Sequence, residues 1–468
     1  MAGRTTICAA LTLSMPLACQ APGPELAQAA AAYAAKVTAS ALFVSGRTLD
    51  SVLEQEFAPS RPLDALIRPL LRFEVDPDAR TVTCRLGVGN ATAAYTEGLG
   101  CALVQTPVDP DRRRYARPLP RFRVDAPAPA ELWPRGARAA QPGPEVDAAA
   151  LDAALDLAFA EPDPRAPVFT RAVVVVHEGR LIAERYAPGF DAAMPLPGWS
   201  MSKTLTNALI GLHVGRRALD VHGRPTVSGW REEGDPRGGV LLRHLLAMSG
   251  GLAWSEDYAD PQSDALRMLL FSRDHAEVYA RQPAAAAPGR RYLYASGATN
   301  LLCRELRGCY DRKLAYWQMP ARFFEQVGMH TAVLETDPGG TFVGSSYCYA
   351  SARDWARLGL LYLQDGVIYG ERVLPEGWVE ASTAAAASPA SSGRFGWHIW
   401  LNRDPDGDGP AERNWPELPE DLVHMDGHEG QYVVVSPAAQ LVVVRLGCTK
   451  AGGFPLTAFL RAVHGACR

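Results

Sequence analysis

Apolar runs with a strand period lie near both ends of the second two thirds of the chain, and helical patterns lie between them. Residues 171–186, RAVVVVHEGRLIAERY, read as two strands about a turn, and residues 430–447, GQYVVVSPAAQLVVVRLG, read as a second hairpin. Between them, residues 351–366 have a capping serine followed by an apolar helical repeat. Hairpins separated by helices predict the α+β class, with an antiparallel sheet flanked by helices.

The pattern changes toward the N-terminus, where it predicts a separate small domain over residues 22–105. An alanine-rich helical stretch is followed there by RFEVDPDARTVTCRLG at 72–87, a hairpin signal without catalytic residues. Residues 106–145 contain nine prolines, which disfavour both helix and central strand and indicate a linker. We therefore expect a small packing or docking domain, a linker, and a main domain over 146–468.

The first 21 residues, MAGRTTICAALTLSMPLACQA, indicate an export signal, because one arginine precedes a short apolar stretch that ends in small residues. The letters PLAC end at Cys19 and are similar to a bacterial lipoprotein cleavage box, although ordinary cleavage nearby is the alternative. No other segment has the pattern of a spanning helix. The expectation is an exported protein that is periplasmic or anchored to the envelope, with a membrane tether through Cys19 if it is lipidated.

Charge and cysteine content limit which classes of partner, metal site and covalent link this chain can have. A formal net charge of −4, without a long arginine run, excludes the electrostatic footprint of a nucleic-acid-binding protein. No cysteine or histidine cluster has zinc spacing, so we expect neither a metal nor a cofactor. In an oxidising compartment, neighbouring cysteines could form disulfides, with the connectivity left open. The close pairs are Cys84 with Cys101, Cys303 with Cys309, and Cys448 with Cys467, which leaves Cys348.

Lysine is rare, since only four of the 47 basic residues are lysine, and one of them follows a serine by three positions. In GWSMSKTLTNALIG, helical spacing places Ser200 and Lys203 on one face, and the apolar repeat after them predicts a buried helix. Burial favours the neutral amine, which can accept a proton from the serine. The bland alternative for these residues alone is a capping serine beside a solvated lysine.

Two downstream stretches complete a pattern: RRYLYASGATNLL at 290–302 and DGHEGQYVVV at 426–435. With the S-x-x-K element, their order resembles the β-lactamase and penicillin-binding-protein-like serine hydrolases, particularly the class C-like esterases and 6-aminohexanoate-dimer hydrolases. The resemblance covers roughly residues 150–460. It implies a β-lactamase or transpeptidase-like fold with an all-helical lobe.

The resemblance also implies roles. Ser200 would be the acylated nucleophile, Lys203 its activating base, and Tyr294 the phenol of the Y-x-N/S element, which shuttles the proton and ends here in Ser296. We expect the nearby lysine charge to lower the pKa of the phenol. In the segment 248–264, Tyr258 would donate to a substrate or leaving nitrogen.

The third family element departs from the usual Lys-Thr-Gly, because His428, Glu429 and Gly430 occupy its position. The family lysine helps to bind the carboxylate of β-lactams and cell-wall peptides, so a histidine argues against penicillin as the substrate. By analogy, the oxyanion hole would use the backbone N–H groups of Ser200 and Gln431. For that role we expect the side chain at 431 to matter little.

These observations predict an exported serine hydrolase that cleaves a small-molecule ester or amide through an acyl-enzyme. A β-lactamase or D-alanyl-D-alanine carboxypeptidase is the alternative in the same fold, and the missing Lys-Thr-Gly disfavours it. An inactive envelope module that binds a muropeptide or protein is the alternative from another class. The intact trio of Ser200, Lys203 and Tyr294 argues against that module, which has no need of reactive groups.

Overall fold

The computed structural model describes most of the chain. The predicted export signal at 1–21, with Cys19, and residues 106–126 of the predicted linker lie outside the described residues. Among the residues that are described, no helix has the length and apolarity needed to cross a bilayer. The described ranges are 23–58, 67–105, 127–385, 393–404, 413–450 and 453–467.

The main sheet has six strands in the order β12-β13-β14-β15-β5-β6, and every neighbouring pair is antiparallel. The two predicted hairpins form β5–β6 and β14–β15, and β15 pairs with β5, so the ends of the main domain meet in the middle of the sheet. The α+β class expected from the sequence is therefore confirmed. The strands are β5 (Thr170–His177), β6 (Arg180–Tyr186), β12 (Trp400–Leu401), β13 (Val423–Gly427), β14 (Gln431–Ser436) and β15 (Leu441–Gly447).

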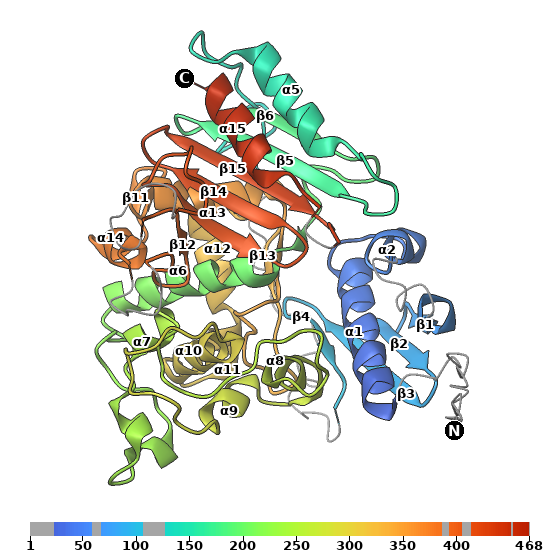
Figure 1. Cartoon of the computed structure of the whole chain (residues 1–468), viewed down its shortest axis with the longest axis vertical. Coiled ribbons are helices and arrows are strands. Elements are labelled where there is room, and N and C mark those ends of the chain that lie inside the picture. The colour runs from blue at the N-terminus through green and yellow to red at the C-terminus, as the bar shows by residue number, and fades with distance from the viewer. Residues whose placement is uncertain are drawn as a thin grey trace, which may run out of the picture.

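Both faces of this sheet are covered, which explains why its central strands are continuous valine runs. Val173 and Val175 face a core that contains α5 (Ala148–Phe159) and α15 (Leu456–Ala466). Val174 and Val176 belong to the larger core on the opposite face, where α13 (Ala352–Leu363) packs (Figure 1). A strand buried on both faces needs apolar residues at every position.

A helical lobe, drawn in green to yellow, lies below the sheet in Figure 1. Between lobe and sheet runs α6 (Ser202–Gly215), whose residues 202–213 are all buried. The lobe and its surroundings comprise η3 (Ser228–Arg231), η4 (Pro236–Gly239), α7 (Leu242–Leu246), α8 (Asp264–Leu266), the π-helical turn η5 (Arg267–Phe271), α9 (His275–Ala280), α10 (Ser296–Gly308), α11 (Lys313–Trp317) and α12 (Met319–Val327). The remaining elements are β7 (Leu196–Pro197), η2 (Trp199–Met201), β8 (Val333–Leu334), β9 (Cys348–Ala350), β10 (Val367–Ile368), β11 (Glu371–Arg372) and α14 (Trp378–Thr383).

Residues 23–58 and 67–105 form a compact N-terminal unit beside the sheet and the lobe (Figure 1). A four-stranded antiparallel sheet, in the order β1-β2-β3-β4, packs against the alanine-rich α1. The contact is close, since a Cβ added at Gly89 would lie 2.3 Å from the backbone of α1. Its elements are α1 (Pro24–Phe43), α2 (Leu49–Gln55), η1 (Arg68–Leu70), β1 (Arg72–Asp76), β2 (Thr81–Leu86), β3 (Gly89–Thr96) and β4 (Gly100–Leu103).

The disulfides considered from the sequence are wrong, because every described cysteine is a free thiol. Cys84 lies on β2 and Cys101 on β4, with β3 between them. Strands are about 4.8 Å apart, so the two Cα atoms are separated by more than the ~7 Å that a disulfide spans.

The other two pairs fail for similar reasons. Cys303 lies in α10 and Cys309 caps the same helix, six positions later, and that spacing advances a helix by about 9 Å. Cys448 follows β15 and contacts α2, whereas Cys467 packs in the core that contains α5 and α15. Closeness in sequence therefore did not bring either pair into reach.

Candidate active site

Ser200 lies in the 3-10 turn η2, and the α-helix α6 begins two residues later at Ser202. The turn is tightly held, since a Cβ at Gly198 would lie 2.1 Å from the ring of Trp355. Trp199 has a φ of +48°, a left-handed conformation that costs a non-glycine residue roughly 1–3 kcal/mol.

Lys203 comes from the first turn of α6 and is 2% exposed. Its Nζ donates to Oγ of Ser200 at 3.0 Å, to Oγ of Ser296 at 3.1 Å, and to the carbonyl of Ser345 at 2.9 Å. The predicted contact between serine and lysine is therefore present. The solvated lysine of the bland alternative is excluded by the burial of the amine.

Burial lowers the pKa of Lys203 to about 8, and the charge of Glu256 partly opposes this shift. A buried ammonium loses hydration that its surroundings only partly replace, which favours the neutral amine. The neutral form keeps two N–H donors, enough for Ser296 and Ser345, and turns its lone pair toward Ser200. This arrangement suits a general base at mildly alkaline pH.

Glu256 holds this arrangement together, and sequence reasoning missed it. Its carboxylate accepts from both the hydroxyl and the backbone N–H of Ser296, the latter at 2.9 Å. It also accepts from the indole of Trp254 and from the hydroxyl of Tyr258 at 2.6 Å. The carboxylate thus hydrogen-bonds to Ser296 rather than to the amine of Lys203. No motif marks this pairing, because Glu256 and Ser296 are 40 positions apart.

Tyr294 stands beside the same amine, with the Nζ of Lys203 4.7 Å from its ring centroid. Burial raises the pKa of the phenol well above its usual value, and a hydrogen-bonding contact with the Ser200 side chain opposes this rise. The lowered pKa expected from the sequence is wrong, because burial, with the nearby charges of Glu256 and Asp426, raises the pKa of this phenol. The phenol is therefore protonated at neutral pH.

The turn between β13 and β14 carries His428 and Gly430, and Gln431 begins β14. All three lie near η2, which contacts both strands. The side chain of His428 is 57% exposed, and its ring lies edge-on to Trp199 at 5.6 Å. Gly430 has a φ of +81°, and a Cβ there would lie 2.5 Å from Nη1 of Arg445. A glycine is therefore required at 430 for the turn to close.

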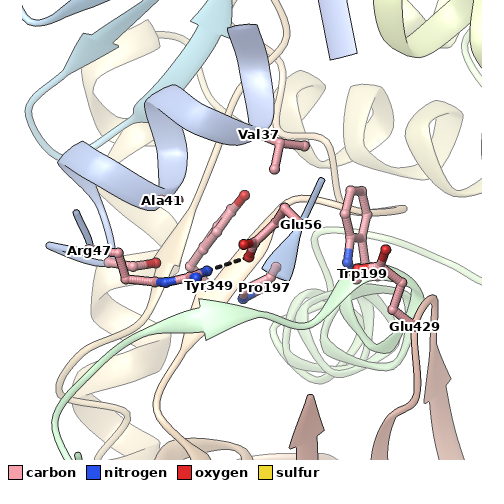
Figure 2. Close-up of a pocket in the computed structure, with 9 residues that line it drawn as sticks. Val37, Ala41, Arg47, Glu56, Pro197, Trp199, Tyr349 and Glu429 are labelled. Carbon is pink, nitrogen blue, oxygen red and sulfur yellow. Dashed lines mark hydrogen bonds and ion pairs between the residues drawn. The ribbon is translucent and has the colours of Figure 1, made fainter. Parts of the chain in front are cut away.

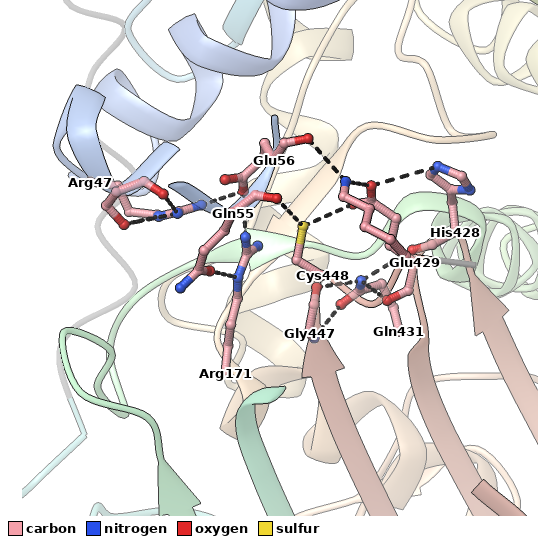
Figure 3. Close-up of polar contacts among 11 residues, drawn as sticks. Arg47, Gln55, Glu56, Arg171, His428, Glu429, Gln431, Gly447 and Cys448 are labelled. Atoms are coloured by element: carbon pink, nitrogen blue, oxygen red, sulfur yellow. Dashed lines mark hydrogen bonds and ion pairs between the residues drawn. The ribbon is translucent and has the colours of Figure 1, made fainter. Parts of the chain in front are cut away.

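The side chain of Gln431 has a structural role, whereas we expected from the sequence that its identity would matter little. It is 1% exposed, and its amide nitrogen donates to the carbonyls of His428 at 3.1 Å and Gly447 at 2.7 Å (Figure 3). Its amide oxygen accepts from the N–H of Gly447 at 3.0 Å. The residue ties the turn to the end of β15, so its amide fixes the backbone at 431.

A cavity of about 880 Å³ opens at Ser200 and is also lined by Tyr258, Tyr294, Asp426 and His428. Tyr258 is 47% exposed, but its hydroxyl is committed to Glu256 rather than free for a substrate. Burial raises the pKa of Asp426 to about 6. This carboxyl group was missed in the sequence.

Ser296, the last residue of the Y-x-N/S element and by that resemblance a substrate-binding candidate, is fully buried. Its hydroxyl links Lys203 to Glu256 rather than lining the cavity. The site therefore combines a serine, an adjacent low-pKa amine and a protonated phenol at one end of a cavity.

Comparisons with known proteins agree with this geometry. A family model described as Beta-lactamase matches residues 168–458. A 6-aminohexanoate-dimer hydrolase of Paenarthrobacter ureafaciens is 24% identical over 230 residues, which are 47% of this chain and 59% of that protein. The chain thus spans about three fifths of that relative's length.

Solved structures with the same fold include EstCE1, described as a hydrolase with promiscuous acyltransferase activity. It has a TM-score of 0.51 and 16% identity, and the match covers 68% of this chain and 98% of EstCE1. A penicillin binding protein from Bacillus halodurans has a TM-score of 0.50 and 16% identity, and the match covers 67% of this chain and 98% of that protein. At such identities the likeness is one of fold.

Proposed function

The chain belongs to the Beta-lactamase family, and on this premise we propose that it is an exported serine hydrolase that cleaves a small ester or amide. The observation that carries the proposal is the buried Lys203 amine, with its pKa lowered to about 8, 3.0 Å from Oγ of Ser200. A binding module has no use for an amine held in this state beside a hydroxyl.

In the proposed reaction, Oγ of Ser200 attacks the substrate carbonyl as its proton passes to the neutral amine of Lys203. The new C–O bond gives a tetrahedral oxyanion, which the N–H groups of Ser200 and Gln431 would stabilise by roughly 3–4 kcal/mol each. The bond to the leaving alcohol or amine then breaks, and the protonated phenol of Tyr294 supplies the leaving group with its proton. Lys203 returns a proton to Tyr294.

Water then hydrolyses the acyl-enzyme by the same groups in reverse order. An amide needs the proton donor more than an activated ester does, because an amine anion is a poor leaving group. The substitution of His428 for the family's lysine supports an ester or amide over a β-lactam. Lys450, which also lines the cavity, is paired with Glu429.

The first test is hydrolysis of p-nitrophenyl butyrate by the purified protein and by Ser200→Ala. We expect turnover by the wild type and only background rates for the variant, with little cleavage of nitrocefin by either. Ser228→Ala, at an exposed position of η3, is the matched control and should retain the full rate. Retained turnover in Ser200→Ala would refute the nucleophile, and a folded but inert wild type would favour the binding module.

Export and the tether through Cys19 belong to the same proposal and have their own test. Expression with residues 1–21 in a Gram-negative host, followed by fractionation and mass measurement, should find the chain outside the cytoplasm and shortened near Cys19. A mass increase of a diacylglyceryl group would establish the lipidated form. An unprocessed cytoplasmic chain would argue against both.

A further inference from the structure

The cavity at Ser200 has a wall that the hydrolase part does not supply. Residues of α1, the end of α2 and η1 line it together with Ser200 and Tyr294. The family model begins at residue 168, so this wall comes from the chain's own N-terminal unit. The unit therefore contributes to whatever the cavity holds.

The wall is mainly apolar, although Glu56 and Arg68 also lie on it. Leucines of α8 and η5 line the same cavity, so a largely apolar space continues from Ser200. Transfer of an apolar group into such a space is favoured by roughly 25 cal/mol for each Å² removed from water. The apolar lining residues include Leu26, Ala30, Tyr33 and Phe57 from the N-terminal unit, and Leu266 and Leu269 from the hydrolase part.

An aromatic row connects this space to the nucleophile. The ring of Tyr33 stacks on Trp199, with centroids 6.4 Å apart and planes inclined by 10°. Phe57 meets Tyr33 edge-on at 6.5 Å. Since Trp199 directly precedes Ser200, a group attached to the serine would meet the wall of the N-terminal unit.

A buried ion pair fixes the first anchor of this wall. Lys36 of α1 and Glu335 of the hydrolase part are 3% and 0% exposed and pair directly. Glu335 also accepts from Ser40 at 2.9 Å and from the N–H of Cys101 at 2.6 Å. Gly100 permits this approach, because a Cβ there would lie 2.4 Å from the Glu335 side chain.

A second anchor joins the end of α2 to the strand ends of the main sheet (Figure 3). Glu56 accepts from Arg171 at 2.6 Å and also pairs with Arg47. Lys450 donates to the carbonyl of Glu56 at 3.0 Å and pairs with Glu429, in the turn beside His428. The anchor thus reaches the turn that carries the candidate oxyanion donor.

Between the anchors the two parts are in close contact. A small cavity of about 10 Å³ lies there between Val37 and Ala41 of α1 and Trp199 and Tyr349 of the hydrolase part (Figure 2). A volume of this size holds about one water molecule. The N-terminal unit is therefore a fixed wall rather than a loosely tethered domain.

We propose that the N-terminal unit is the acyl-chain selector of the enzyme and favours esters and amides whose acyl group is an extended apolar chain over those whose acyl group is short. The inference rests on the proposed acyl-enzyme at Ser200. The acyl group stays bound to the serine until water attacks, whereas the leaving group must depart. A fixed apolar wall beside the serine suits the part that stays.

The test compares p-nitrophenyl butyrate with p-nitrophenyl octanoate. Each buried methylene contributes about fourfold to kcat/KM, so four methylenes predict a preference for octanoate on the order of 100-fold in the wild type. Ala30→Trp fills the space from α1 and should abolish the preference for octanoate over butyrate. Ala79→Trp, the same change in the exposed turn between β1 and β2, should keep it, and Ala30→Leu should lower it partially.

A wild type that hydrolyses butyrate with an equal kcat/KM for octanoate overturns the selector, as does an Ala30→Trp variant with the wild-type profile. A chain-length preference seen only with alkyl butyrates would place the selection on the leaving group and also overturn it. Calorimetry of octanamide binding to Ser200→Ala is independent of turnover. We expect binding with a negative heat-capacity change, absent after the addition of Ala30→Trp. Failure of hydrolysis with this binding intact refutes the proposed function alone.

Discussion

Two buried lysines, one at the active site and one at the interface with the N-terminal unit, are kept in different electrostatic settings. Lys36 contacts a carboxylate directly, with Ser40 and the ring of Tyr347 around it. Lys203 contacts two hydroxyls and a carbonyl, and the carboxylate of Glu256 hydrogen-bonds to Ser296 rather than to the amine, although its charge raises the pKa of Lys203. Lys36 is therefore one partner of a buried ion pair, whereas the amine of Lys203 is held by hydroxyls and a carbonyl and has its pKa lowered by burial.

The largest effect should come from replacing the active-site lysine. Lys203→Met removes the base, so kcat/KM for p-nitrophenyl butyrate should fall by on the order of 10³-fold. The kcat/KM of Lys203→Arg should fall as far, because a guanidinium does not lose its proton and cannot act as the base. The melting temperature of Lys203→Met should stay close to that of the wild type, since the buried ammonium is already disfavoured. Turnover near the wild-type rate would remove Lys203 from the mechanism.

The same substitution at the interface lysine should lower stability and leave turnover nearly unchanged. Lys36→Met leaves Glu335 buried without its cation, which should lower the free energy of unfolding by about 3–5 kcal/mol in urea titrations. Butyrate turnover per folded molecule should change by less than about threefold. Lys313→Met, at a half-buried lysine of α11, should cost less than about 1 kcal/mol. Recovery of stability in the double variant Lys36→Met/Glu335→Gln would attribute the loss to the pair.

The pH profile gives a smaller effect with a defined sign. With the pKa of Lys203 at about 8, kcat/KM should rise with pH and level off above that value, because only the neutral amine accepts the proton. Glu256 raises this pKa, so Glu256→Gln should move the midpoint to lower pH. Glu277→Gln, at a surface carboxylate of α9 whose side chain is 40% exposed, should leave it in place. An upward shift in Glu256→Gln would contradict the assigned coupling.

The sequence predicted the setting of Lys203 beside Ser200, but it did not predict the carboxylates near either lysine. The spacing of Ser200 and Lys203 and the order of the later motifs predicted the fold and the amine beside the serine, because helix geometry is local. Glu256 could not be found, since its contact with Ser296 depends on how the segment around 256 folds back onto α10. The anchor at Lys36 depends on a contact across 299 positions, and neither residue stands in a motif.

The smallest effect should come from reducing agent, and it tests what holds the two regions together. Buried thiols lie beside both anchors, since the N–H of Cys101 donates to Glu335 and the Sγ of Cys448 contacts the carbonyl of Gln55. All seven described cysteines are free, so ion pairs and packing carry the docking. Dithiothreitol should therefore leave the melting temperature unchanged within about 1 °C, and unfolded protein should titrate as thiols without reductant. A fall of several degrees would mean that covalent links assist the interface, and the electrostatic contrast between the two lysines would then explain less of its stability.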